Sequence, residues 1–318
     1  MIRAAILKGS GLAPIRRFVK EGKAFQPMVR RFIAGDTLDD AMAVTEDLLR
    51  RGFMVSLDFL GENTRSRDEA LASGRTYTTM LRRIGERNGH RSFEPAGYPD
   101  GLVEPLNISI KLTQCGLDQS KEFAEENVRK VARAAADLGV FVRVDMEGSA
   151  YTQATMDIVT SVYADFPNVG LVLQSYLYRT ATDIETAVVR GIRVRLVKGA
   201  YLETPPIAIA RKSAVDAAYL KQAKRLLVAG VYPALATHDG RLICELLKFV
   251  ADNQLAKDHF EFQMLYGIRR DLQDALLKEG YRVRIYLPFG DAWYPYFARR
   301  IAERPANGMF VLKSLFLK

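Results

Sequence analysis

Three short stretches of the sequence combine charged, amide and aromatic side chains in patterns that could perform chemistry. They are Lys111–Gln114 (KLTQ), Arg195–Tyr201 (RLVKGAY) and Tyr294–Pro305 (YPYFARRIAERP). A guanidinium fork is the natural partner of a carboxylate, and a fixed cation stabilises negative charge that develops beside it. Alone, each stretch is also typical of a solvated basic surface. Whether these stretches form a functional site therefore depends on the strands and helices that position them.

Polar residues recur at every second position within several short apolar runs. In Ile108–Thr113 one face holds Ile, Ile and Leu, and the other holds Ser, Lys and Thr. In Val140–Asp145 three valines alternate with Phe, Arg and Asp. Side chains alternate between the two faces of a strand, so each run predicts a strand with one apolar and one polar face.

Eight such β-branched runs alternate with longer segments of helical spacing. The runs are Met54–Leu60, Leu106–Thr113, Val140–Glu147, Val169–Ser175, Val194–Val197, Tyr232–His238, Phe260–Leu265 and Val283–Leu287. Alternating strands and helices predict a parallel sheet, and eight units predict a closed (β/α)8 barrel of the TIM type. The alternative is an open doubly wound sheet, but no G-x-G-x-x-G follows the first run.

The predicted barrel does not account for the two ends of the chain. Residues 1–50 are expected to form an N-terminal helical segment that packs on the barrel, with Asp36 or Thr37 as a helix N-cap. Residues 51–318 are expected to form the catalytic barrel, with a C-terminal helix over the face where the strands end.

The polar face of each strand should point into the barrel, because the outer face must pack on helices. This places seven charged residues inside: Asp58, Lys111, Arg143, Asp145, Arg195, Glu261 and Arg284. Such charges are tolerated only when paired or bound to a ligand. We expect the deeper ones to form ion pairs, Arg143 with Glu261 or Asp58. The others lie near the C-terminal ends of strands, where barrel enzymes hold their active sites.

Composition narrows the function classes. The net charge is +9, but the basic residues are spread along the chain without an arginine-rich tail, which argues against a nucleic-acid-binding protein. Two cysteines, Cys115 and Cys244, predict free thiols in a reducing compartment. Three histidines without metal-ligand spacing predict no metal site. No run of 18 apolar residues occurs, so we expect a soluble cytoplasmic enzyme.

Together and in this order, the three stretches closely resemble the proline dehydrogenase family, FAD enzymes that oxidise L-proline to Δ1-pyrroline-5-carboxylate. The resemblance also includes Val142–Glu147, Leu173–Tyr176, Ala236–Asp239 and Glu261–Gly267. It covers nearly the whole chain, whose size is similar to that of the short bacterial monofunctional enzymes.

The resemblance implies a substrate site at the carboxylate end of proline. Arg299 and Arg300 would clamp the carboxylate, with Lys111 near Glu303 at the same end. Tyr286 would pack over the substrate, and Tyr296 would line it. Without the resemblance, the two arginines suggest a solvated helix end and Tyr286 an inward aromatic plug.

The resemblance also implies catalytic positions for Asp145 and Arg195. Arg195 would lie near flavin N5, where a fixed cation stabilises the negative charge of the reduced ring. Implied contacts of the non-covalent FAD are Met146, Gln174, Arg195, Val197, Lys198, Gly199, Ala200, Tyr201, Thr237 and His238. His238 is alternatively a hydrogen-bonded structural histidine.

The implied electron acceptor is a membrane quinone, and a basic protein would be attracted to the anionic inner face of the membrane. A competing interpretation is a class I aldolase, in which Lys111 or Lys198 forms a Schiff base. Strand alternation argues against Lys198, because it lies three residues after Arg195 and should face away from it.

Overall fold

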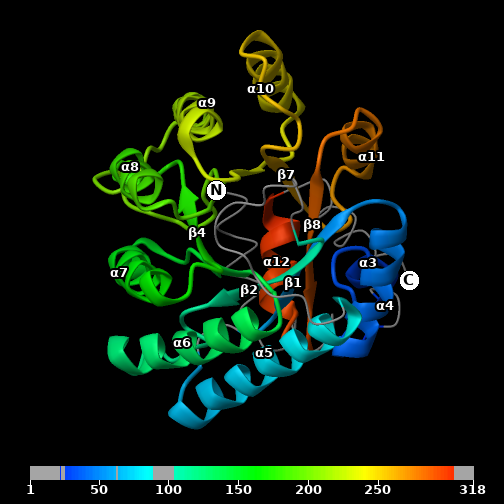
Figure 1. Ribbon diagram of the computed structural model, residues 1–318, viewed down its shortest axis with the longest axis vertical. Helices are drawn as coiled ribbons and strands as arrows, with labels where there is room; N and C mark the ends of the chain where they lie inside the picture. The colour runs from blue at the N-terminus through cyan, green and yellow to red at the C-terminus, as the bar shows by residue number, and fades with distance from the viewer. Residues whose placement is uncertain (1–21, 23–25, 62–63, 89–103, 304–318) are drawn as a thin grey trace.

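Eight parallel strands form a closed barrel in chain order, each hydrogen-bonded to the next and β8 to β1 (Figure 1). The computed structural model describes residue 22 and residues 26–61, 64–88 and 104–303. The strands are β1 Met54–Phe59, β2 Leu106–Lys111, β3 Val142–Asp145, β4 Val169–Gln174, β5 Val194–Val197, β6 Ala234–Ala236, β7 Glu261–Leu265 and β8 Val283–Phe289. The predicted barrel is confirmed.

Each predicted run coincides with one strand, and β8 alone continues beyond its predicted end. Proline usually interrupts a strand because it has no N–H to donate. In β8, Pro288 and Phe289 stay in register with Asp58 and Phe59 of β1, and the Leu60 N–H donates to the Phe289 carbonyl at 2.9 Å. The strand therefore reaches Phe289.

Seven helices follow the first seven strands and form an outer ring. They are α5 Arg67–Asn88, α6 Lys121–Asp137, α7 Ser149–Asp165, α8 Thr180–Arg190, α9 Lys212–Ala229, α10 Gly240–Asp252 and α11 Arg270–Lys278. The short helix α3, Gln26–Arg30, precedes them. No helix within the described ranges has the length and apolar character needed to cross a membrane.

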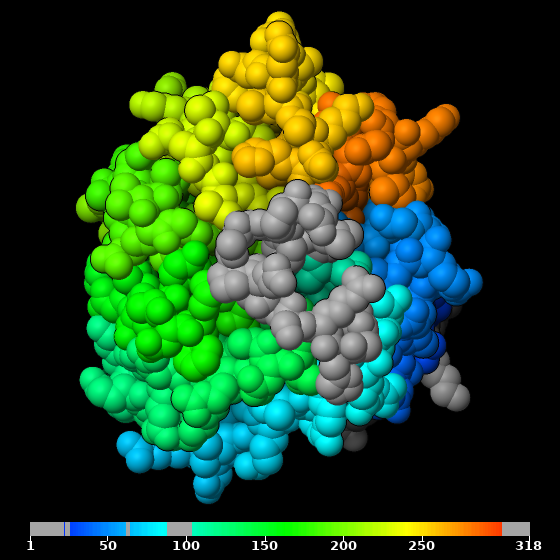
Figure 2. All heavy atoms as spheres, in the orientation of Figure 1, coloured from blue at the N-terminus to red at the C-terminus, as the bar shows by residue number. Residues whose placement is uncertain are grey.

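The ring position between β8 and β1 belongs to α4, Leu38–Arg50, which contacts both strands. In the space-filling view, the blue segment containing α4 lies between orange α11 and cyan α5 (Figure 2). Thr37 is the N-cap, and it forms a capping box with Asp40 through two hydrogen bonds of 3.1 Å. The proposed boundary at residue 50 therefore falls between a helix of the outer ring and the first strand.

Because α4 fills this position, the helix after β8 does not join the ring. This helix, α12 (Tyr294–Glu303), lies within the circle of outer helices (Figure 1). Trp293, which directly precedes the helix, and Tyr294 and Phe297 within it are buried in a cluster with Phe32 and Ile33 of the N-terminal segment. This cluster anchors α12 over the barrel, as the sequence predicted for a C-terminal helix.

The polar faces of the strands point into the barrel, and the charges there are buried. Glu261 and Arg284 are fully buried, and the Arg284 Nε lies 2.8 Å from a Glu261 oxygen. Burial opposes ionisation of Glu261, but Arg284 outweighs it and lowers the pKa of the glutamate to about 2. Arg193 and Glu104 form a second pair at 3.1 Å. These residues lie at the N-terminal ends of the strands and close the barrel there.

The predicted pairing of Arg143 with Glu261 or Asp58 is wrong. Arg143 donates to the backbone carbonyls of Leu171 and Arg193, at 3.1 and 2.7 Å. Its neighbour on β4 is Gly170, where a Cβ would lie only 2.8 Å from an Arg143 nitrogen. The missing side chain lets one terminal nitrogen of Arg143 reach two main-chain oxygens, while its buried Nε and other terminal nitrogen have no hydrogen-bond partner among the described residues.

The buried pair provides a stability prediction. Arg284→Met should lower the free energy of unfolding by about 3–5 kcal/mol, because it leaves Glu261 buried without its cation. Urea unfolding measures the change. Arg225→Met, which breaks the exposed pair between Arg225 and Glu185, is the control and should have little effect. Equal losses in the two variants would contradict the proposed importance of the buried pair.

Candidate functional site

A cavity of about 710 Å³ opens where the strands end, within the size range of small-molecule sites. It is lined by Asp58, Lys111, Asp145, Met146, Val172, Gln174, Arg195, Val197, Lys198, Gly199, Ala200, Tyr201, Lys212, Ala236, Thr237, His238, Asp239, Gly240, Gln263, Met264, Leu265, Arg269, Tyr286, Tyr296, Arg299 and Arg300. Every predicted site residue with a described side chain is in this set. The side chain of Glu303 lies outside the described part of the chain.

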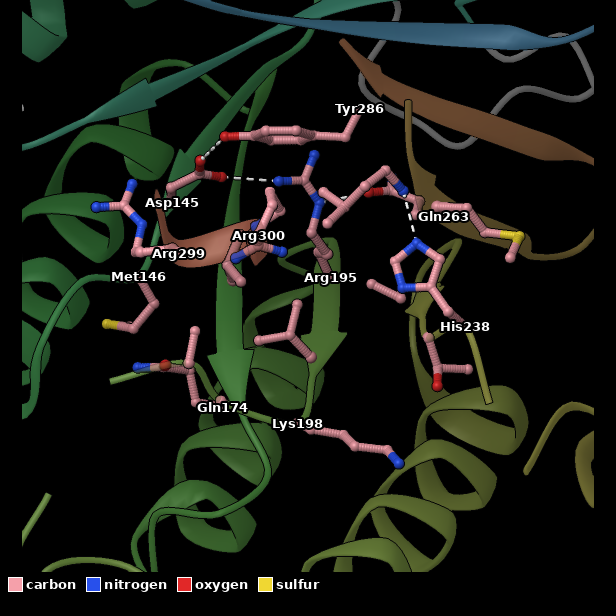
Figure 3. Close-up of a pocket in the computed structure, with 18 of the residues that line it drawn as sticks. Asp145, Met146, Gln174, Arg195, Lys198, His238, Gln263, Tyr286, Arg299 and Arg300 are labelled. Carbon is pink, nitrogen blue, oxygen red and sulfur yellow. Dashed lines mark hydrogen bonds and ion pairs between the residues drawn. The ribbon is translucent and has the colours of Figure 1, made fainter. Parts of the chain in front are cut away.

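Asp145 connects the polar groups at the bottom of the cavity (Figure 3). One of its oxygens accepts from Arg195 at 2.7 Å, and the other accepts from the Tyr286 hydroxyl at 2.7 Å. Lys111 lies 3.4 Å from the second oxygen. Burial and the Asp145 charge raise the pKa of Tyr286 well above its usual value, so the phenol keeps its proton and donates.

Asp58 lies behind this group and forms an ion pair with Lys111. The carboxylate is 1% exposed, and burial raises its pKa to about 6 although Lys111 opposes the shift. A carboxyl group with this pKa changes charge near neutral pH. The sequence predicted that Asp58 faces inward, but it did not predict a partner. In the structure this partner is Lys111.

Arg195 is held from several strands. Its Nε donates to the Gln263 side-chain oxygen, and one terminal nitrogen donates to Ser109 and Ser56, at 3.1 and 3.4 Å. Its guanidinium also lies 5.1 Å from the centre of the Tyr286 ring. Gln263 was not predicted as a site residue, although it lies two residues after Glu261 and therefore on the same inward face of the strand.

The loop after β5 forms one wall of the cavity. Gly199 has a φ of +118°, which favours glycine, and a Cβ there would lie 2.2 Å from the Tyr176 ring. The Lys198 ammonium contacts Asp216 at 2.6 Å and Asp239 at 3.2 Å. This loop therefore needs glycine to approach Tyr176, and its residues from Val197 to Tyr201 line the cavity.

The two candidate Schiff-base lysines are both engaged in ion pairs. Lys198 contacts two carboxylates, and Lys111 contacts Asp58 and Asp145. A lysine nucleophile must lose its proton, and it is usually activated by an apolar pocket or a neighbouring cation. The surroundings of both lysines are anionic, so the geometry argues against the aldolase interpretation.

His238 and the residues of α12 complete the walls. The Nε2 atom of His238 accepts a hydrogen bond from the Leu265 N–H at 2.9 Å, so the proton of the neutral ring lies on Nδ1 (Figure 3). The guanidinium groups of Arg299 and Arg300 point in different directions in the same view. Arg300 also lies 5.2 Å from the centre of the Tyr296 ring.

No group of histidine, cysteine, aspartate and glutamate within the described ranges could hold a metal ion. The cavity instead combines cationic side chains, a neutral phenol and the loop after β5. Such a set can bind an anionic group and stabilise negative charge on an aromatic ring.

Comparisons with known proteins agree with these features. The family model described as proline dehydrogenase matches residues 41–313. Proline dehydrogenase 1 of Bacillus subtilis is 39% identical over 289 residues, 91% of each chain. Proline dehydrogenase of Deinococcus radiodurans is 36% identical over 291 residues, 91% of this chain and 90% of the relative.

A solved structure agrees in fold. The crystal structure of proline utilization A from Bdellovibrio bacteriovorus, inactivated by N-propargylglycine, is 27% identical with a TM-score of 0.81. The match covers 95% of this chain and 36% of that one, so the chain corresponds to about a third of the larger protein.

The raised pKa of Asp58 provides a second prediction. Its folded-state pKa of about 6 exceeds the value near 4 expected in the unfolded chain, so the folded protein loses stability as pH rises between them. Asp58→Asn should remove this pH dependence, so the difference in free energy of unfolding between the variant and wild type should shift in favour of the variant by up to about 3 kcal/mol from pH 4 to pH 7.

Urea unfolding at several pH values tests this expectation. Asp274→Asn, at an exposed carboxylate paired with Arg51, is the control and should follow wild type. A difference between Asp58→Asn and wild type that does not change with pH would contradict the assignment.

Proposed function

This chain belongs to the proline dehydrogenase family of enzymes, and from this premise we propose that it oxidises L-proline to Δ1-pyrroline-5-carboxylate with non-covalent FAD and a quinone acceptor. The observation that carries the proposal is the cluster of Asp145, Arg195, Tyr286 and Lys111 at the base of a cavity that two arginines of α12 also line. FAD bound in the cavity would supply the two-electron oxidising chemistry that this reaction needs.

The residues present fit a flavin. The loop from Val197 to Tyr201 lines the cavity, and Gly199 allows it to pack closely on Tyr176. Residues that would hold the cofactor are Met146, Gln174, Arg195, Val197, Lys198, Gly199, Ala200, Tyr201, Thr237 and His238. Lys198, whose ammonium is held by Asp216 and Asp239, would contact the cofactor.

The substrate end of the proposed site is formed by α12 and the base of the cavity. Arg299 and Arg300 would bind the proline carboxylate from two sides, because successive residues on a helix point in different directions. Lys111, Tyr286, Tyr296 and Glu303 would complete the pocket. Since the Tyr286 phenol stays protonated, it can pack over the substrate ring without adding charge.

Arg195 and Asp145 would have complementary electrostatic roles. Oxidation leaves positive charge at the proline nitrogen and negative charge on the reduced flavin. The Asp145 carboxylate would stabilise the first, and the Arg195 guanidinium the second. Their mutual hydrogen bond of 2.7 Å fixes the two groups relative to each other.

The proposal predicts that the purified protein is yellow. Acid precipitation should release the flavin into the supernatant, because no covalent bond holds it. The absorption spectrum of the protein before and after addition of L-proline is the measurement. A colourless protein that FAD cannot reconstitute would falsify the proposed function.

Arg299→Met and Arg300→Met should each weaken proline binding by about ten- to a hundred-fold, since a charge-assisted hydrogen bond contributes about 1.5–3 kcal/mol. Flavin binding should mostly survive in both. The Michaelis constant for proline and the flavin content are the measurements. Values near wild type in both variants would place the carboxylate elsewhere.

The proposed quinone acceptor implies a cytoplasmic protein that transiently contacts the inner face of the membrane. The net charge of +9 supports such contact with anionic lipid. A water-soluble quinone analogue should reoxidise the proline-reduced flavin faster than NAD does under identical conditions. Preferential reduction of NAD would contradict the proposed acceptor.

A further inference from the structure

The guanidinium of Arg195 is fixed by side chains of four strands. Its Nε donates to Gln263 of β7, and Nη1 donates to Asp145 of β3 at 2.7 Å. Nη2 donates to Ser109 of β2 at 3.1 Å and Ser56 of β1 at 3.4 Å. These are four of the five N–H groups of a guanidinium, so its plane and rotation are determined by its neighbours.

Gln263 can act as an acceptor for Arg195 in only one of its two amide orientations. Its oxygen faces Arg195 because its NH2 group donates to the Glu261 carboxylate, two residues earlier on the same face of β7. Arg284 keeps Glu261 ionised, so the carboxylate can only accept. A flipped amide would set oxygen against carboxylate and NH2 against guanidinium, two repulsive contacts.

A continuous chain of polar contacts therefore runs up the barrel. It begins at Arg284, in the layer of ion pairs at the N-terminal ends of the strands. It passes through Glu261 and Gln263 and ends at Arg195 beneath the cavity. Arg284 and Glu261 are fully buried, and Gln263 and Arg195 are 3% and 4% exposed. Water has little access to these bonds, so a lost partner is not replaced easily.

We propose that Gln263, oriented by Glu261, is a positioning residue that holds the Arg195 guanidinium against the flavin ring. The inference rests on the proposed function, because it requires FAD beside Arg195. Without Gln263, the main remaining partner of Arg195 is Asp145 on the opposite side of the guanidinium. The arginine would then turn toward Asp145, and its charge would stabilise the reduced ring less effectively.

Gln263→Met keeps the length and volume of the side chain but removes both hydrogen bonds. We expect the midpoint potential of the bound flavin to fall, and the rate constant for flavin reduction by proline to fall about ten- to a hundred-fold. The half-saturating proline concentration should change less than about threefold, because Arg299 and Arg300 hold the carboxylate. Gln222→Met, at a buried glutamine of the outer helix α9, should leave all three quantities unchanged.

A double-mutant cycle with Arg195→Met separates positioning from a general structural effect. Methionine has no N–H that could donate to Gln263, so Gln263→Met should add no further change in potential in that background. Additive effects would overturn the inference, and so would a wild-type potential in Gln263→Met. If Gln263→Met does not fold, Gln263→Asn is the substitute. Its amide is one methylene shorter and cannot reach both Glu261 and Arg195, so the same changes are expected.

Measurements on the wild-type protein show whether a negative result contradicts this inference or the proposed function itself. A wild type that binds no flavin overturns both. A yellow wild type that proline reduces, together with a Gln263→Met variant of unchanged potential, overturns only the positioning role of Gln263.

Discussion

The structure depends on one electrostatic constraint: a charge inside the barrel must have a partner, because water cannot solvate it there. The barrel meets this constraint in two layers. At the N-terminal ends of the strands, Arg284 pairs with Glu261 and Arg193 with Glu104. At the C-terminal ends, Asp145 contacts Arg195 and Lys111 beneath an open cavity. The first layer closes the barrel, and the second leaves charged groups facing a ligand.

The two layers are connected by hydrogen bonds. The layer at the C-terminal ends is therefore held in place although it faces an open cavity. Gln263 accepts from Arg195 and donates to Glu261, which carries the orientation of the closed layer into the site. Fixed dipoles and charges stabilise a transition state without reorganising during the reaction, which is the advantage of such rigidity. A lumen filled with aliphatic side chains, as in many barrels, could not transmit orientation in this way.

The end of the cavity proposed to bind the carboxylate depends on a change in the usual order of helices. Helix α4, from before the barrel, occupies the ring position between β8 and β1. Helix α12 can therefore leave the ring, and its buried aromatic residues anchor it against the N-terminal segment. This arrangement brings Arg299 and Arg300 to the cavity. The N-terminal helix thus contributes to the site without supplying a residue to it.

The sequence by itself determined the eight strands, the face of each strand that turns inward, and the residues that gather at the strand ends. These features follow from local periodicity, since side chains alternate along any strand. The partners were decided only by the tertiary structure: Arg143 binds backbone carbonyls beside Gly170, and Asp58 pairs with Lys111. Gln263 was visible as an inward residue, but not as a partner of Arg195. The reason is geometric, because partners across a barrel depend on strand tilt, stagger and depth, and none of these is encoded in the spacing along one strand.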